Sequence, residues 1–415
     1  MTLRSGTLLA LGLVCVSAAP HMLQAQGYSL PTPPQQAIIE KDMSRHFGDA
    51  PKDGGPLATD LSATLTPAAI DHAMRKVADW QLARSEPFFD RIWTWSALYT
   101  GFMAASESTG DPRYRDAMLN MSEHFHWQMR NRLPNADDQS VGQTFLELYR
   151  VQADPQRLSP TKADLDSVID LKTVSATDSR IPWWWCDALF MAPPVWSHLY
   201  VATGDRKYID YLDAQWKQTS DLLYDQQEHL YARDATYIGR KEANGSKIFW
   251  SRGNGWVMAG IVRILEDLPA DDPRRPFYIK QLQEMSARVA ELQGQDGLWH
   301  AGLLDAQTYT LPEVSGSAFF TYAIAYGINH GLLDGKKFRP VVERAWKGIL
   351  GHVYADGRLG CIQQTGAEPA FYLPTASYNY GVGAYLLAGS ELKRMASGKP
   401  AGAGRPGKKS HASGG

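Results

Sequence analysis

Asp187 is placed where a carboxyl group could donate a proton. It follows three consecutive tryptophans, residues 183–185, and Cys186, and it opens an apolar segment. Burial against apolar rings disfavours the charged form of a carboxyl group, which raises its pKa and suits it to general acid catalysis. An Asp at a helix start is also an ordinary N-cap. Two hypotheses therefore stand for Asp187, a catalytic acid and a helix cap.

Asp137 and Asp138 form a second candidate acidic site. One of them can cap the following helix while the other faces a ligand, and a second carboxylate near Asp187 would raise the pKa of Asp187 further. The pattern does not choose between the two residues. Both are therefore candidate catalytic groups.

The segment 250–256, Trp-Ser-Arg-Gly-Asn-Gly-Trp, combines a cation, two glycines and a terminal ring. Glycines let a ligand approach the backbone closely, and a guanidinium meets a carboxylate with two parallel hydrogen bonds. The segment lacks the Lys-Ser/Thr ending of a phosphate loop. We predict that Arg252 binds a carboxylate of the ligand and that Trp256, with at least one of residues 183–185, lines the pocket.

An internal repeat indicates the elements that must position these residues. Residues 96–114 are echoed by residues 187–208, and looser copies occupy 141–155, 255–278 and 315–338. Each unit reads as a helix rich in small and aromatic residues, a Gly or Pro stop, an Asp cap and a more amphipathic helix. Residues 377–392 can pair with residues 66–85 to complete a sixth hairpin. We predict an all-α (α/α)6 barrel, with an open solenoid as the alternative.

In such a barrel the segments before the inner helices meet at one end. These segments are rich in aromatic residues, carboxylates and arginines and comprise residues 88–95, 133–140, 180–187, 249–256, 311–316 and 373–380. Meeting at the positive ends of six helices, they would form a crater that attracts anions. A uronic acid fits that description. The substrate-binding candidates are Arg252, Asn254, Trp256, Trp184, Trp185, Trp95, Tyr231 and Glu313.

The composition excludes several partners. The 42 basic and 44 acidic residues give a net charge of -2, so neither a nucleic acid nor an anionic membrane is expected. The eleven histidines are scattered, and His124 and His126 point to different faces of a helix, so we predict no metal and no cofactor. Thirteen Trp and nineteen Tyr favour carbohydrate weakly. Cys186 and Cys361 are expected to be free and buried.

The ends of the chain differ in composition from its centre. Residues 1–25 have the positive start, apolar stretch and small-residue cleavage site of a signal peptide. Residues 26–65 read as an extended lead-in, 66–394 as the catalytic barrel, and 395–415 as a disordered tail. The mature protein is therefore expected to be periplasmic or secreted, without a membrane-spanning segment.

Three strings taken together resemble glycoside hydrolase family 105, the unsaturated rhamnogalacturonyl hydrolases. They lie at residues 184–193, 250–256 and 313–320, and the similarity covers about residues 66–392. The family is related to the unsaturated glucuronyl hydrolases of family 88. The resemblance implies an (α/α)6 barrel and an oligosaccharide substrate that carries a 4,5-unsaturated uronic acid at its nonreducing end.

The resemblance also implies a mechanism. The Asp matching Asp187 protonates C4 of the enol ether and helps water to add at C5, and the resulting hemiketal opens and releases the aglycone. The second family carboxylate falls at Asp137 or Asp138. Some members carry a His where this chain has Tyr231, Arg233 and Asp234, which leaves open unsaturated galacturonyl or glucuronyl ends. The alternatives are a noncatalytic carbohydrate-binding barrel and another barrel enzyme, such as an epimerase or an inverting glycosidase.

Overall fold

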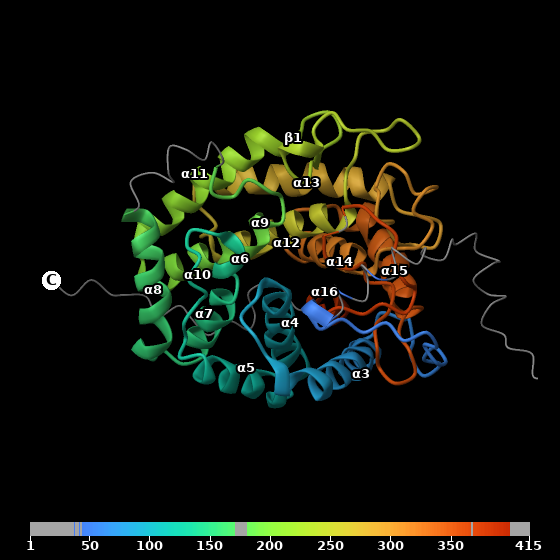
Figure 1. The fold of residues 1–415 in the computed structure, drawn as a ribbon, viewed down its shortest axis with the longest axis horizontal. Helices are drawn as coiled ribbons and strands as arrows, with labels where there is room; N and C mark the ends of the chain where they lie inside the picture. The colour runs from blue at the N-terminus through green and yellow to red at the C-terminus, as the bar shows by residue number, and fades with distance from the viewer. Residues whose placement is uncertain (1–36, 38–40, 42–43, 171–180, 367, 399–415) are drawn as a thin grey trace, which may run out of the picture.

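A computed structural model describes residues 37, 41, 44–170, 181–366 and 368–398. Two concentric rings of helices make up most of it (Figure 1). The inner ring comprises α4 (Trp93–Thr109), α7 (Gly142–Val151), α10 (Pro193–Thr203), α12 (Ser251–Asp267), α14 (Val314–Asn329) and α16 (Asn379–Ala396). The outer ring comprises α3 (Pro67–Ser85), α5 (Pro112–His124), α8 (Pro155–Asp170), α11 (Arg206–Leu223), α13 (Arg275–Glu291) and α15 (Gly335–Leu350).

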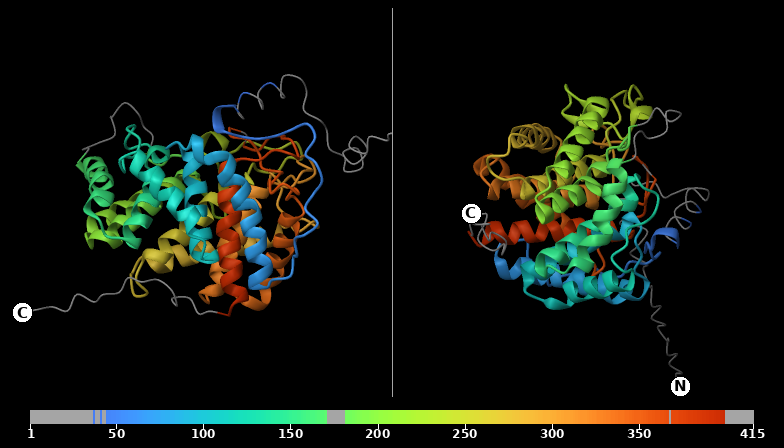
Figure 2. Two further views of the ribbon diagram at one scale, coloured as in Figure 1. Left: turned by 90° about the horizontal axis from the view of Figure 1, so that it is seen from below. Right: turned by 90° about the vertical axis from the view of Figure 1, so that its left-hand side faces the viewer.

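The inner ring is closed. Each inner helix contacts the next one along the chain, and α16 packs extensively against α4, so that the last inner helix meets the first. The terminal helices α3 and α16 lie side by side, as the left view of Figure 2 shows. They form the sixth hairpin that the sequence predicted. The (α/α)6 barrel is thus confirmed, and the open solenoid is wrong.

Burial explains the alternation of helix types. Nearly every residue of α12 and α14 is buried, because these helices are surrounded by others. The outer helix α15 buries one face, which includes Phe338, Val342 and Trp346, and exposes the other. Packing of an apolar face, and not helix propensity, provides most of the stability of such helices.

The caps between paired helices have the expected chemistry. Asp111, Asp205 and Asp334 each accept a hydrogen bond from the backbone N–H two residues later, at the starts of α5, α11 and α15. Gly110 and Gly204 end α4 and α10 with φ of 72° and 74°, a left-handed conformation that glycine adopts without strain.

At two places in the inner ring, a separate short helix precedes the long helix. The four-residue helix α6 (Ala136–Gln139) precedes α7, and α9 (Ala188–Met191) precedes α10. Pro193 and Pro194 lack backbone N–H donors, so α9 cannot continue into α10 as a regular helix. The two short helices contact each other. They carry the acidic candidates to one place at the end of the barrel.

The remaining segments are short or irregular. The strands β1 (Tyr224–Asp225) and β2 (Leu230–Tyr231) pair antiparallel, and 3-10 turns cover Glu86–Phe88 and Ala235–Tyr237. The described part of the lead-in crosses the C-terminal half of the barrel, where Asp49 pairs with Ser377 and Leu57 with Tyr354. The predicted signal peptide and most of the tail lie outside the described residues. Among the described helices, none is long and apolar enough to cross a membrane.

Candidate active site

Asp187 lies at the start of α9, but its side chain does not cap that helix. Its carboxylate Oδ1 instead accepts a hydrogen bond from the thiol of Cys186 at 3.1 Å. Burial raises the pKa of Asp187, although the positive charge of Arg233 opposes this shift. The side chain keeps partial access to solvent. The geometry therefore favours the proton donor over the helix cap.

Asp137 and Asp138 differ sharply in their surroundings. Asp138 is buried and is held by Arg132, whose backbone N–H and guanidinium donate to its carboxylate at 2.7–3.0 Å. Asp137 accepts none of these bonds and remains half-buried. Burial and the negative charge of Asp187 raise the pKa of Asp137 to about 7. Of the two candidates, Asp137 is thus the partner of Asp187, and Asp138 supports the loop.

Arg233 is the cation that acts on both acids. Its positive charge opposes the raised pKa of Asp187 and of Asp137. Burial disfavours its charge, but the negative charge of Asp187 and the hydrogen bond to Asp234 more than compensate, so the pKa of Arg233 is raised. The backbone fixes this placement, because Cys186 N–H donates to the Arg233 carbonyl at 2.9 Å and Trp185 pairs with Asp234.

Glu368 adds a third carboxylate from the loop that precedes α16. Its Oε1 lies 3.7 Å from Arg233 Nη2, and its Oε2 accepts a hydrogen bond from the hydroxyl of Tyr237 at 3.2 Å. Burial and the negative charge of Asp187 raise the pKa of Glu368, against the effect of Arg233. Two loops distant in the sequence therefore meet beside Asp187.

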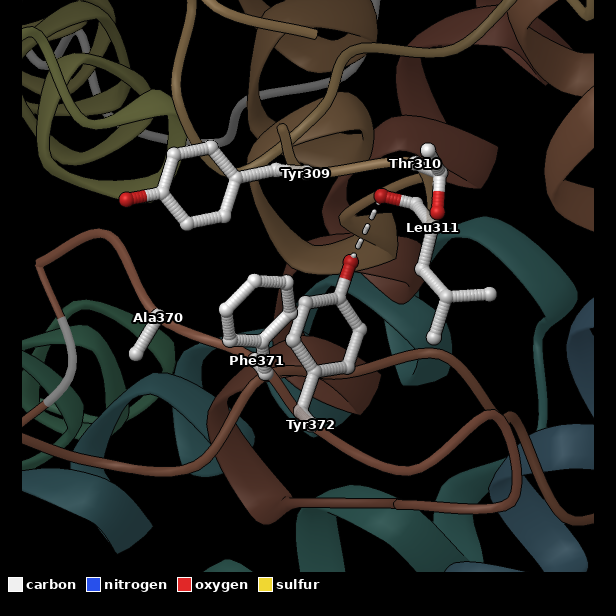
Figure 3. A pocket seen from close by; sticks show the side chains of 6 residues that line it. All are labelled: Tyr309, Thr310, Leu311, Ala370, Phe371 and Tyr372. Atoms are coloured by element: carbon white, nitrogen blue, oxygen red, sulfur yellow. Dashed lines mark hydrogen bonds between the residues drawn. The ribbon is translucent and has the colours of Figure 1, made fainter. Parts of the chain in front are cut away.

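Three aromatic side chains, Tyr309, Phe371 and Tyr372, form what we call the aromatic rim. Tyr309 lies 5.6 Å from the ring of Phe371, and the hydroxyl of Tyr372 donates to the Leu311 carbonyl at 3.0 Å. Figure 3 shows these side chains around a small pocket between the two segments. Phe371 is 36% exposed, so its face is open to a ligand. The rim therefore presents an exposed aromatic face on the loop that carries Glu368.

Arg252 occupies a different position from the one predicted. It is fully buried, and its Nη1 and Nη2 donate to the carbonyls of Gln363 and Gln364, both at 2.8 Å. The guanidinium is enclosed between the rings of Trp250 and Tyr380. A ligand could reach it only by breaking these contacts, so Arg252 does not lie where the prediction of a carboxylate-binding role placed it.

The tryptophans predicted to line the pocket differ in how deeply they are buried, because consecutive side chains cannot all face the same way. Trp184 is half-buried and faces Arg233, whose guanidinium carbon lies 5.9 Å from the ring. Trp185 is buried but for 7% of its surface. Trp256 is completely buried against Phe190 and Phe319. The rim role predicted for Trp184 fits its position, whereas the roles predicted for Trp185 and Trp256 are contradicted by burial.

The other residues that were predicted to bind the substrate are buried and contact only the protein. Trp95 packs on Phe89 and Phe47. Asn254 holds the backbone of Tyr231 with two hydrogen bonds, and the Tyr231 hydroxyl bonds to Ser220 and Gln281. Glu313 caps α14 and accepts a bond from Gln363 N–H. Trp95 thus supports the fold by ring packing, and the polar groups of Asn254, Tyr231 and Glu313 are already paired within the protein.

No group of three or more His, Cys, Asp or Glu suited to a metal occurs within the described ranges. The absence of a cofactor stays a prediction, which needs a measurement. Both cysteines predicted to be free, Cys186 and Cys361, are free and buried.

Comparison with known proteins identifies the family. The sequence model of Glycosyl Hydrolase Family 88 matches residues 65–396. The chain belongs to this family. It is therefore a glycoside hydrolase, and the predicted relation to family 88 is confirmed.

Relatives of this family 88 chain carry informative names. It is 39% identical to an "Unsaturated 3S-rhamnoglycuronyl hydrolase" of Formosa agariphila, over 80% of this chain and 92% of that protein. It is 30% identical to a protein of the same name from an Alteromonas species, over 81% and 89%.

Solved structures agree with the fold. A family 88 glycosyl hydrolase from Bacteroides vulgatus superimposes with a TM-score of 0.75 at 29% identity, over 80% of this chain and 99% of that one. A possible family 105 member from Salmonella enterica reaches 0.68 at 19% identity, over 89% and 100%, and this likeness concerns the fold alone.

The site of this family 88 chain contains two groups that sequence reasoning did not select, Arg233 and Glu368. The signal for Arg233 was its position in the segment where the chain departs from the family pattern. Glu368 has no local signal, because it reaches the site only when the loop before α16 folds over the barrel.

Proposed function

We propose that the chain removes 4,5-unsaturated uronic acid from the nonreducing end of lyase-generated oligosaccharides. The observation that carries this proposal is the half-buried pair of Asp187 and Asp137, both with raised pKa values, beside the cation Arg233. Two neighbouring carboxyl groups that interact lose their protons in two separate steps, so one of them stays protonated to a higher pH than an isolated carboxyl group. Such a pair can deliver a proton and later recover one.

The steps follow from that pair. The carboxyl group of Asp187 gives its proton to C4 of the enol ether, and positive charge develops at C5 next to the ring oxygen. Water attacks C5 and returns a proton to the Asp187 carboxylate. The hemiketal then opens and releases the aglycone. The glycosidic bond is not attacked, so the carboxylate spacing used for retaining and inverting enzymes does not apply.

For the aglycone we propose rhamnose, because both relatives above are named rhamnoglycuronyl hydrolases. Galacturonic and glucuronic acids differ at C4, and elimination makes C4 trigonal, so both yield the same unsaturated ring. Discrimination between the two kinds of product must then come from the linkage and the aglycone. The aromatic rim of Tyr309 and Phe371 is placed to contribute to it.

The test is optical, because hydration destroys the conjugated double bond. The purified protein is incubated with unsaturated uronyl-rhamnose disaccharides, with and without a sulfate on the rhamnose, and the ultraviolet absorbance is followed. We expect the absorbance to fall and free rhamnose or its sulfate to appear. Constant absorbance with every disaccharide would refute the proposal. Full activity after exhaustive chelation would support the prediction that no cofactor is needed.

We also propose that the enzyme acts outside the cytoplasm, after removal of residues 1–25. The support is the signal-like composition of that segment. Fractionation of producing cells, with N-terminal sequencing of the protein, tests it. A protein that keeps Met1 in the cytoplasmic fraction would contradict the proposal.

A further inference from the structure

The search for the group that binds the uronate carboxylate starts from the reaction. In the proposed function, which this inference rests on, the substrate carboxylate is attached to C5, next to the carbon that Asp187 protonates. A cation that binds it must therefore lie beside Asp187 and have hydrogen-bond donors to spare. Arg252 is not accessible to such a ligand, because it is fully buried and its two terminal nitrogens already donate to the carbonyls of Gln363 and Gln364.

Arg233 meets both conditions. Among the described residues, its guanidinium makes one hydrogen bond, to Asp234, and the terminal nitrogen Nη2 lies beyond hydrogen-bond distance from Glu368, at 3.7 Å. A guanidinium has five N–H donors, so several remain for a ligand. The group is half-buried, with 26% of its side chain exposed.

The backbone holds Arg233 in register with the acid. The hydrogen bond from Cys186 N–H to the Arg233 carbonyl and the bridge between Trp185 and Asp234 align the two segments. Asn254 fixes the same segment two residues earlier, through its bonds to the Tyr231 backbone. The side chain of Arg233 is thus oriented by main-chain contacts that do not depend on a ligand.

We propose that Arg233 binds the carboxylate of the unsaturated uronic acid and that Arg252 holds the loop before α16. Trp184 lies beside the Arg233 guanidinium and closes one side of this subsite. A bound carboxylate would take the Nη2 side of Arg233 that faces Glu368. Because burial and the nearby Asp187 favour the neutral form of Glu368, this approach need not bring two full negative charges together.

The test compares an unsaturated uronyl disaccharide with its methyl ester, which lacks the negative charge. The wild-type enzyme should prefer the free acid. Arg233→Gln should raise KM for the acid by about 10- to 100-fold, as expected for a lost charge-assisted pair, and should abolish the preference over the ester. Arg233→Lys keeps the charge that Asp234 needs and should retain part of the preference, because an ammonium cannot form the two-bond fork.

Arg252→Lys tests the alternative that Arg252 binds the substrate carboxylate. It should lower Tm, since buried hydrogen bonds to the loop are lost, while its folded fraction keeps the preference for the acid. Binding of acid and ester to an Asp187→Asn variant, with and without Arg233→Gln, gives the same comparison without turnover.

The outcomes separate the two proposals. A wild-type protein that consumes neither disaccharide refutes the proposed function. A wild-type enzyme that is active but does not distinguish acid from ester overturns the role of Arg233. So does an active Arg233→Gln variant that still prefers the acid, or an Arg252→Lys variant that loses the preference at unchanged Tm.

Discussion

At the scale of single residues, the site depends on differences between chemically similar neighbours. Asp137 and Asp138 are adjacent, yet Arg132 binds the second and leaves the first to face Asp187. Arg233 and Arg252 are both near Asp187, yet Arg252 is enclosed by the protein and Arg233 is not. Function is therefore assigned by burial and by hydrogen-bond partners, since residue type does not distinguish the members of either pair.

Replacement of Asp187 by Asn should abolish proton donation. We expect kcat to fall by about 10²- to 10⁴-fold, the usual contribution of a general acid. Tm should change little, because the Asp187 side chain caps no helix. Absorbance kinetics and thermal unfolding measure the two effects. A variant that keeps more than about a tenth of the wild-type rate would exclude Asp187 as the acid.

The pH profile should report the coupled pair. Activity needs a protonated Asp187, and the pKa values of Asp187 and of its neighbour Asp137 are both raised, so kcat/KM should decline as the pH rises through the range in which the pair titrates. Asp137→Asn removes the repulsion that arises when both carboxyl groups are ionised, so the alkaline limb should move to lower pH. An unchanged limb would show that the two acids do not interact.

Asp138→Asn is the matched control for that experiment. It lies one residue away and leaves the Asp137 carboxyl in place. Its main effect should be a lower Tm, because Arg130 and Arg132 lose their buried partner. A shift of the alkaline limb equal to that of Asp137→Asn would reverse the assignment of the two residues.

At the scale of elements, the loop before α16 completes the site from outside the inner ring. Arg252 and Glu313 bind its backbone at Gln363 and Gln364, and Gln363 and Gln364 reach forward to the carbonyls of Ala370 and Phe371. These buried contacts fix the position of Glu368 and Phe371 over the barrel end. The aromatic rim is thus held in place by hydrogen bonds to the loop backbone, and the loop needs no helix of its own for this.

Phe371→Ala should weaken binding of the aglycone without removing the acid. Loss of one aromatic face costs about 0.5–1.5 kcal/mol, so KM should rise about 2- to 10-fold at nearly constant kcat. Val201→Ala, an exposed apolar change at the C-terminal end of α10, is the control and should leave both constants unchanged. An unaltered KM in Phe371→Ala would remove the rim from the aglycone subsite.

At the scale of the whole molecule, the two ends of the barrel carry different charge clusters. The end opposite to Arg252 holds Asp267, the last residue of α12. Its carboxylate accepts bonds from Arg150 at 2.6 Å, Ser197 at 2.6 Å and His198 at 2.5 Å, which joins α7, α10 and α12. Against the effect of burial, the positive charge of Arg150 and the hydrogen bonds from His198 and Ser197 hold the pKa of Asp267 well below its usual range.

Asp267→Asn should therefore reduce stability and spare catalysis. Removing one member of a buried charge cluster typically costs about 3–5 kcal/mol. Because the folded-state pKa is lowered, this contribution is present above about pH 4 and is lost as the pH falls further. Denaturant unfolding at pH 7 should show the loss, with kcat of the folded enzyme unchanged. Asp271→Asn, at an exposed residue four positions on, should leave stability unaltered.

The architecture was determined largely by the sequence alone. Small and aromatic residues on one helix, a Gly or Pro stop and an Asp cap recur along the chain, and these local signals specify hairpins. The contact of α16 with α4 in the structure then shows that the hairpins close into a ring. The sequence also predicted an apolar environment for Asp187, because this residue follows three consecutive tryptophans and Cys186. Burial raises the pKa of Asp187, as that setting predicted.

Only the tertiary structure decided which neighbours of Asp187 face a ligand. Whether Arg252 is open depends on carbonyl groups more than a hundred residues away, at Gln363 and Gln364. Asp137 is separated from Asp138 by the path of Arg132, and Glu368 arrives with a distant loop. Burial and hydrogen-bond pairing are properties of the packed chain, so motifs locate the catalytic end of the barrel, and packing selects the residues that act there.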